Sequence, residues 1–307
     1  MTIIFYWILQ ILWIPALAPL FLGIMRKVKA HLQMRSGADI VQPYRDLWKL
    51  FHKDEVISID ASWVFRSAPY LIFAVLLVVG AIIPIFVGII QSAISDLLLV
   101  VYLFALSTFI LALAGMDTGS AFGGFGSSRE MTIAALTEGG LLFSLLVGAF
   151  LAGTTNLYAI ADFISTLPFS AFIPVMFAFA AFTIALLAET AHFPFDNPTT
   201  HLELTMIHEA MILEYSGKRL ALIEWAAANK FLIFLTLGAN LFFPTGFSPF
   251  DVKSGIVFFA VYLAKILIIS ISIAILESAI AKFRFFRLPD LLFTSFILSV
   301  IGLILIL

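Results

Sequence analysis

The chain of 307 residues contains no cysteine, and charged residues make up only 12% of it. Without thiolate ligands it has no means of holding an iron–sulfur cluster, a disulfide or a cysteine-based zinc site. The 17 Lys and Arg nearly balance the 19 Asp and Glu, so no strongly basic face for nucleic acid is indicated. These absences exclude electron-carrying clusters and nucleic-acid binding, and we expect no cofactor in this chain.

Most of the chain is apolar: 62% of its residues are hydrophobic, and 33 of them are Phe. Long apolar runs nearly free of charge are typical of polytopic α-helical membrane proteins. The first run lacks a basic n-region and a small-residue cleavage site, so we expect residues 1–25 to be a true span and not a signal peptide. The sequence predicts an all-α membrane domain over residues 1–307. Its eight spans are expected near 2–25, 68–92, 97–115, 132–153, 169–189, 219–243, 255–277 and 291–307.

The loops between these spans alternate in charge. Segments 26–66, 116–131, 190–218 and 278–290, with Arg219 at the edge of the third, hold every Lys and Arg except Lys230, Lys253 and Lys265. Cytoplasmic loops carry the excess of Lys and Arg in membrane proteins. We therefore expect these segments in the cytoplasm, both termini outside, and the chain in the cytoplasmic (inner) membrane.

The first cytoplasmic loop, 26–66, contains a short amphipathic pattern. Between Gln42 and Phe51, apolar residues recur at helical spacing, with Arg45, Asp46 and Lys49 off that face. Such a pattern predicts a helix that lies at the membrane interface. Two roles stay open for it, a membrane anchor and a docking surface for a soluble partner.

The glycine-rich segment GMDTGSAFGGFGSSRE covers residues 115–130. It matches neither the GxGxxG nor the GxxxxGK phosphate-binding pattern, and no βαβ unit surrounds it. The sequence therefore disfavours a nucleotide site. We expect a flexible loop that packs closely on another subunit.

Acids gather without Lys or Arg in the stretch AETAHFPFDNPTTHLELTMIHEAMILEYSG, residues 188–217. Asn197-Pro198 and the Thr200 to Glu203 spacing predict that a helix begins near 198–200. Eleven residues make about three turns, so Glu203 and Glu214 would share one face of that helix. One alternative is that Glu203 only caps the helix and the other acids are solvated. His208-Glu209 fails the HExxH zinc pattern at its last position, and no metal site is expected.

Several charged residues fall inside the predicted spans or at their ends. A charged group at mid-membrane costs about 2.5–3.5 kcal/mol on insertion scales, so such groups are usually paired or functional. Burial also raises a carboxyl pKa toward the range in which it loads and releases protons near neutrality. The pattern indicates a proton path, with neutralised structural ion pairs as the alternative. These residues are Glu138, Glu189, Glu224, Lys230, Lys265 and Glu277.

A family resemblance rests on the motifs in the acid-rich stretch, AET, PFD and EYSG, with Glu203-Leu204 between them. The pattern resembles the H subunit of respiratory complex I along the whole chain, including Gln33-Met34-Arg35 in the first loop. Two details depart from that family. Ser36-Gly37-Ala38 stands where a Gly-Pro pair follows the arginine, and the spacing from Glu203 to Glu214 is longer. Together with the glycine-rich motif, they favour the membrane-anchor subunit of group 4 [NiFe] hydrogenases, including the formate hydrogenlyase and hydrogenase-4 types.

The resemblance implies a non-catalytic subunit that couples redox chemistry in a peripheral arm to ion translocation. Its expected partners are hydrogenase-like and Fe–S hydrophilic subunits, which carry the NiFe centre and clusters, and antiporter-like membrane subunits. The implied proton-transfer residues are Glu138, Glu189, Glu203, Glu209, Glu214, Glu224, Lys230, Lys265 and Glu277. The implied interface with the peripheral arm comprises Arg26, Arg35, Arg45, Arg129, Glu130, Asp196, Arg284 and Arg287. Anionic lipid is an alternative contact for each arginine.

Two other functions are weighed against this one. A quinone-site H subunit of an NADH:quinone oxidoreductase-like complex would admit quinone behind the first loop, and the missing Gly-Pro pair disfavours it. An autonomous transporter is disfavoured because the sequence shows no inverted repeat. If the acids form a proton path, glutamine at Glu138 or Glu214 is expected to stop ion translocation.

Overall fold

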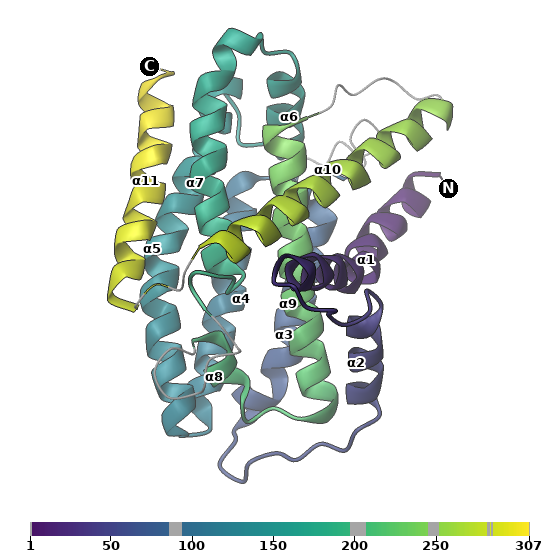
Figure 1. Ribbon diagram of the computed structural model, residues 1–307, viewed down its shortest axis with the longest axis vertical. Helices are drawn as coiled ribbons and strands as arrows, with labels where there is room; N and C mark the ends of the chain where they lie inside the picture. Colours follow the sequence, from purple (N-terminus) through teal and green to yellow (C-terminus); the bar gives the residue numbers. More distant parts are fainter. Residues whose placement is uncertain are drawn as a thin grey trace.

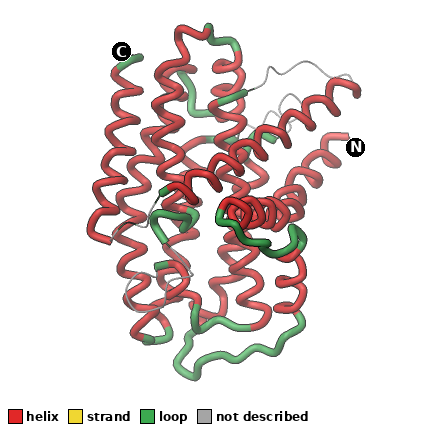
Figure 2. The backbone as a smooth tube through the Cα atoms, in the orientation of Figure 1, coloured by secondary structure: helices red, strands yellow, loops and turns green. Residues whose placement is uncertain are grey.

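The computed structural model describes residues 2–85, 94–196, 207–244, 252–280, 283 and 285–306, and helices dominate this part of the chain (Figures 1 and 2). One isolated β-bridge joins Asp96 to Asn156. The all-α expectation is confirmed. The elements are α1 (Thr2–Leu32), α2 (Gln42–Phe51), α3 (Trp63–Ile82), α4 (Leu97–Asp117), α5 (Ala121–Ala152), α6 (Leu157–Ser165), η1 (Phe169–Phe172), α7 (Ile173–Glu189), α8 (His208–Ile212), α9 (Gly217–Leu237), the π-helix η2 (Gly238–Phe242), α10 (Val252–Ala279), η3 (Phe285–Arg287) and α11 (Leu288–Ile304).

The long helices form an upright bundle. Helix α5 packs against α4, α7 and α11, while α9 packs against α1 and α3. Figure 1 shows α10 crossing the front of the bundle diagonally, so that only its C-terminal end approaches α7. An apolar cavity, the wedge between α10 and α7, lies between the two helices.

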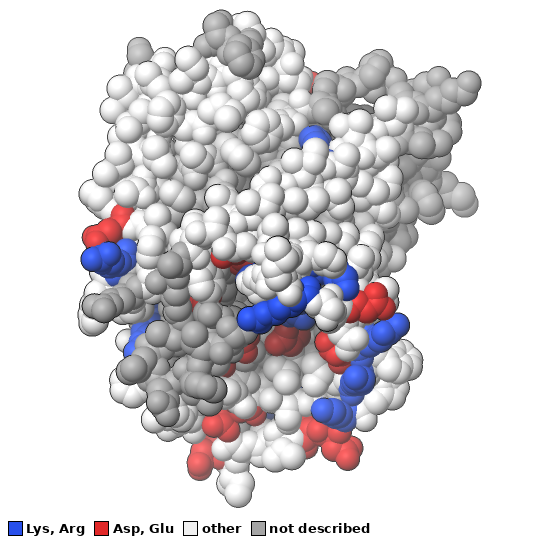
Figure 3. All heavy atoms as spheres, in the orientation of Figure 1, with Lys and Arg blue, Asp and Glu red and all other residues white. Residues whose placement is uncertain are grey.

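Seven helices in the described part of the chain are long and apolar enough to cross a membrane. The remaining expected span, 169–189, corresponds to α7, a shorter apolar helix preceded by the 3₁₀ turn η1. All eight expected spans therefore fall on helices. On the face in Figure 3, the Lys, Arg, Asp and Glu side chains gather in the lower half, and almost none lies in the upper half. The chain is an integral membrane protein.

The glycine-rich segment is helical, so the loop prediction is wrong. Helix α5 begins at Ala121, where the Ser120 side chain accepts a hydrogen bond from the Gly123 amide. The glycines let neighbouring backbones approach closely. A methyl group at Gly123 would overlap the carbonyl oxygen of Gly115, and one at Gly126 would lie 2.8 Å from the carbonyl oxygen of Ile207. Close contact of α4, α5 and the segment before α8 is the physical reason for these glycines.

A matched pair of substitutions tests this packing. Gly123→Ala is expected to destabilise the chain by about 1–3 kcal/mol, the usual effect of overpacking. Gly124→Ala is expected to stabilise it by up to about 1 kcal/mol, because alanine favours a helix over glycine. No atom outside the local helix lies within 4 Å of a methyl group at Gly124. Thermal unfolding in detergent measures both, and equal melting temperatures for the two variants would contradict the close approach.

The amphipathic helix α2 has the predicted bounds but not the predicted orientation. Figure 1 shows it upright beside the lower end of α9, not across the bundle. The Tyr44 hydroxyl donates to the carbonyl of Ala16, and the Phe51 ring meets Trp225 edge-on, with ring centroids 6.1 Å apart. Trp48 is 69% exposed. Its exposure leaves both predicted roles, anchor and docking surface, available to this helix.

Helix α6 lies where the sequence indicates only a loop, residues 154–168. It is pinned to the start of α4, where the Asp96 carboxylate accepts hydrogen bonds from the Leu98 amide and the Thr155 hydroxyl. Asn156 caps α6 through the Tyr158 amide. These contacts fix the end of the bundle that lies opposite the charged half.

Candidate functional site

A polar cavity of about 240 Å³ lies among α1, α7, α8, α9 and α10. It brings together charged groups from the ends of several predicted spans. Of the predicted proton-transfer residues, Glu189, Glu209, Glu224, Lys230 and Glu277 line it together. The other charged or titratable residues at its wall are Arg26, Lys29, His192, Asp196 and His208.

The centre of this cavity is a buried ion pair between Glu189, the last residue of α7, and Lys230 on α9. The Glu189 Oε2 and Lys230 Nζ atoms are 2.7 Å apart, and the side chains are only 5% and 12% exposed. Lys230 Nζ also donates to the Thr108 hydroxyl on α4, at 3.0 Å. Three membrane helices are thus joined through one ammonium group. A charge pair at this depth is stable only with such mutual compensation.

Glu130 was predicted at the peripheral-arm interface, but it is buried, with 9% of its surface exposed. It lines a small cavity of about 30 Å³ with Thr108, His208 and Lys230. Such a space has room for roughly one water molecule. Glu130 and Lys230 therefore line the same small cavity, so a further carboxyl group lies beside the Glu189–Lys230 pair inside the bundle. On the same helix, Glu138 is partly buried and lies close enough to Glu189 and Lys230 to interact with both charges.

Asp196, also predicted at the interface, is only 3% exposed. Its Oδ2 atom accepts hydrogen bonds from the backbone amides of Ile207, at 3.1 Å, and His208, at 2.9 Å. This carboxylate satisfies two amides that have no partner within α8. Asp196 consequently fixes where α8 begins, and its contact with a peripheral arm stays a prediction.

The helix predicted from 198–200 to Glu214 is shorter in the described part of the chain, where α8 covers only His208–Ile212. Glu214 lies beyond its end and is exposed, so α8 does not carry this residue on one of its faces. The predicted helix start at 198–200 lies outside the described residues, as do two predicted residues, Glu203 and Arg284.

Glu277, near the end of α10, closes another side of the cavity. Its Oε2 atom is 3.1 Å from Lys29 Nζ, and its Oε1 atom accepts a hydrogen bond from the Phe193 amide at 3.0 Å. The His192 ring stacks on Phe231, with centroids 4.7 Å apart. Burial lowers the pKa of His192, which favours the neutral ring at physiological pH. The turn after α7 is thereby held between α9 and α10.

Lys265 stands apart from the acid cluster, defined as the polar cavity's acids Glu189, Asp196, Glu209, Glu224 and Glu277. Its Nζ atom donates to the carbonyl oxygens of Ala239 and Phe243, at 3.2 and 3.0 Å, and to Asn240 Oδ1, at 3.0 Å. The π-helix η2 makes these oxygens available because its turn departs from α-helical pairing. The predicted hand-over groups Lys230 and Lys265 therefore occupy separate polar sites.

Comparison with known proteins places this arrangement in a family. The NADH dehydrogenase family model matches residues 5–307. The chain belongs to the NADH dehydrogenase family. Among curated relatives, it is 33% identical to formate hydrogenlyase subunit 4 of Escherichia coli, over 95% of both chains. It is 34% identical to hydrogenase-4 component C of the same organism, over 93% of this chain and 90% of that protein.

A more distant relative and a solved structure agree with this placement. The H subunit of the NADH-quinone oxidoreductase of Rhodospirillum rubrum is 30% identical, over 80% of this chain and 75% of that protein. A chain of the membrane-bound sulfane sulfur reductase, an archaeal respiratory membrane complex, has the same fold, with a TM-score of 0.85, 22% identity and full coverage of both chains. The relatives confirm the resemblance to the hydrogenase-type membrane proteins and, more distantly, to complex I.

In this NADH dehydrogenase family member, a second cavity of about 270 Å³ lies among α1, α2 and α9. Arg26 and Glu224 line both this cavity and the acid cluster. Asp46 and Leu47 of α2 contribute to its outer wall. The acid cluster therefore borders a space beside the amphipathic helix.

The predicted interface arginines lie mainly at the surface of the described structure. Arg26, Arg35, Arg45 and Arg287 are exposed, and Arg45 forms a 3.4 Å ion pair with Asp39. The Arg129 guanidinium lies 5.5 Å from the centroid of the Phe285 ring. Their contact with a peripheral arm stays a prediction.

Glu209 gives the acid cluster a testable dependence on pH. Burial, with the nearby Glu224 and Asp196 charges, raises its pKa to about 7, against an opposing effect of Arg26. Neutral Glu209 thus contributes stability that is present below the ordinary pKa of 4.5 and lost as pH rises through about 7. His208 acts oppositely, because burial lowers its pKa to about 4. The stability that neutral His208 contributes is present above its ordinary pKa of 6.5 and is lost as pH falls through about 4.

Comparing the wild-type chain with Glu209→Gln isolates the first effect. The wild-type free energy of unfolding, relative to that of the variant, is expected to fall between about pH 5 and pH 8. Chemical unfolding in detergent at both pH values measures this difference. A difference that does not change with pH would show that Glu209 titrates as an ordinary solvated acid.

Proposed function

We propose that this chain is the membrane-anchor and proton-conduit subunit of an energy-converting, hydrogenase-type complex in the cytoplasmic membrane. The observation that carries the proposal is the buried Glu189–Lys230 pair, set in a polar cavity between membrane-spanning helices. The similarity to formate hydrogenlyase subunit 4 and hydrogenase-4 component C supports the type of complex.

A proton would pass through the cluster by exchange between neighbouring groups. A proton that arrives at the Glu189 carboxylate neutralises it and ends its attraction for Lys230. The ammonium then has Thr108 and the carboxylate of Glu130 as partners within the same cavities. Glu209 and Glu224 would load the site from the cytoplasmic side, and Glu138 would receive the proton deeper in α5. Each step moves only a proton, so this chain needs no redox centre.

The similarity to formate hydrogenlyase subunit 4 and hydrogenase-4 component C supports the choice of partners. Hydrophilic hydrogenase-like and Fe–S subunits would dock at the cytoplasmic face and hold the NiFe centre and clusters. Antiporter-like membrane subunits would receive the coupled ions, and both termini would lie outside the cytoplasm. The exposed arginines and α2 offer the docking surface, with Glu203 and Arg284 as further predicted members.

The second candidate is a quinone-site subunit of an NADH:quinone oxidoreductase-like complex. Its support is the cavity of about 270 Å³ beside α2, which borders Arg26 and Glu224, together with the similarity to the H subunit of NADH-quinone oxidoreductase. In the sequence, Ser36-Gly37-Ala38 at the expected Gly-Pro position disfavours it.

Purification of the intact complex through a tag on this chain separates the two candidates. Co-purified nickel and hydrogen evolution, with ion uptake into proteoliposomes, are expected for the first candidate. Turnover that depends on added quinone, in a complex without nickel, would select the second. A chain that purifies alone and transports ions unaided would contradict both.

A further inference from the structure

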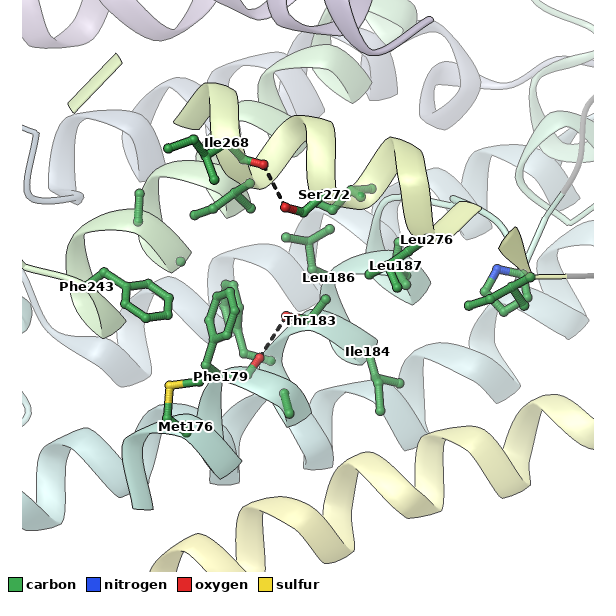
Figure 4. A pocket seen from close by; sticks show the side chains of 18 of the residues that line it. Met176, Phe179, Thr183, Ile184, Leu186, Leu187, Phe243, Ile268, Ser272 and Leu276 are labelled. Atoms are coloured by element: carbon green, nitrogen blue, oxygen red, sulfur yellow. Dashed lines mark hydrogen bonds between the residues drawn. The ribbon is translucent and has the colours of Figure 1, made fainter. Parts of the chain in front are cut away.

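An apolar groove of about 760 Å³ lies between α7 and α10. Figure 4 shows Met176, Phe179 and Leu187 of α7 on one side of it, and Ile268 and Leu276 of α10 on the other. Its lining from Lys265 on α10 to Ile280, just after the end of that helix, spans about 22 Å at 1.5 Å per residue. That length covers most of the ~30 Å hydrocarbon core of a bilayer.

The few hydroxyl groups in the groove are already satisfied. Ser272 Oγ donates to the carbonyl of Ile268 at 2.9 Å, and Thr183 Oγ1 donates to the carbonyl of Phe179 at 2.8 Å (Figure 4). Lys265, at one end, donates to three oxygens of the η2 region. An occupant of the groove therefore needs no hydrogen-bonding groups along its length, which favours a hydrocarbon chain over a polar ligand.

A helix of a neighbouring subunit fits this groove less well than a flexible chain. Helices that associate within a bilayer approach through small residues spaced along one face. The α10 wall instead presents Ile268, Ile269, Ile273 and Leu276, which hold a neighbouring backbone at a distance. Such branched side chains pack well against flexible acyl chains.

The end of the groove near Ile280 and Leu291 carries positive charge. Leu291 lies one turn inside α11, whose N-terminus follows Arg287. Arg287 is exposed, and the Arg129 guanidinium lies over Phe285 in the adjoining η3. A helix N-terminus and guanidinium groups both attract phosphate, and only the exposed Asp290 in the first turn of α11 opposes them within this described segment.

From this arrangement we propose that the groove between α7 and α10 binds an anionic phospholipid of the cytoplasmic leaflet. Its acyl chain lies along the apolar walls, and its phosphate contacts the start of α11 and Arg287. The lipid seals the wedge that the diagonal course of α10 opens beside α7. Of the predicted proton-transfer residues, Lys265 lines this groove, at the end away from α11, and the proposal does not depend on the type of complex.

Two substitutions on α10 test the acyl-chain site. Ser272→Trp places an indole in the groove, whereas Ile275→Trp places one on an exposed position that does not line it. The intact complex is purified in mild detergent, and phospholipid retained per complex is measured by native mass spectrometry. We expect the wild type and Ile275→Trp to retain one more anionic phospholipid than Ser272→Trp.

The contact between the lipid phosphate and Arg287 is tested by the melting temperature of the complex with added lipid. After delipidation, phosphatidylglycerol vesicles are expected to raise the melting temperature of the wild-type complex more than phosphatidylcholine vesicles. Arg287→Gln should remove that preference. Equal lipid retention in Ser272→Trp and Ile275→Trp would overturn the proposal, as would loss of a membrane subunit from Ser272→Trp with lipid content unchanged. An unaltered preference in Arg287→Gln would overturn the headgroup assignment.

Discussion

Replacing Lys230 by methionine is expected to lower the free energy of unfolding by about 3–5 kcal/mol, the usual effect of leaving one member of a buried ion pair without its partner. The Glu189 carboxylate is 5% exposed, and its ion pair with Lys230 joins two different helices. Without the ammonium, the carboxylate either stays charged in an apolar setting or takes up a proton. Thermal unfolding in detergent measures the loss.

A double-mutant cycle separates the pair from its surroundings. Combining Lys230→Met with Glu189→Gln is expected to restore most of the lost stability, because neither charge then lacks a partner. Thr108→Val serves as a control that removes only the hydrogen bond to Lys230 and is expected to cost about 1 kcal/mol. Additive effects of the two charge substitutions would contradict direct coupling between Glu189 and Lys230.

Glu138→Gln is expected to reduce proton translocation in the assembled complex by roughly 10²-fold or more, the typical contribution of a side chain that transfers protons. Glutamine keeps the shape of the side chain but has no proton to exchange. Glu138 is partly buried on α5 and interacts with Glu189 and Lys230. Proton uptake by proteoliposomes, per molecule of hydrogen evolved, measures the effect.

Glu214→Gln is the matched comparison. The sequence predicts that it also stops translocation, but Glu214 is exposed beyond the end of α8, where water offers protons another route. We therefore expect Glu214→Gln to translocate protons at close to the wild-type rate. Equal loss in both variants would place the path through the exposed segment and not through α5.

The spans and most members of the acid cluster are predictable from the sequence because both depend on local properties. Membrane helices are recognisable from apolar runs alone, and Glu189 and Glu277 lie where such runs end. Helix α2 is also located correctly from its apolar spacing, although spacing does not determine orientation. Its upright position depends on contacts with Ala16 and Trp225, far away in the chain.

The loop prediction for residues 115–130 failed because the helix there depends on tertiary contacts. Glycines 123 and 126 suggest a loop when considered locally, yet they permit close packing of α4, α5 and the segment before α8. Once α5 is extended through them, Glu130 becomes a buried residue beside Lys230. Asp196 has the pattern of a surface acid because its backbone amide partners, Ile207 and His208, are 11 and 12 residues away. No local pattern identifies such a partner.

Infrared difference spectroscopy of the working complex tests most directly whether these carboxyl groups carry protons. Turnover is expected to change the carbonyl band of protonated carboxylic acids in the wild type, and glutamine at Glu138 or Glu189 should remove part of that change. A carboxylic-acid band that stays constant during turnover, in a complex that still translocates protons, would contradict the account.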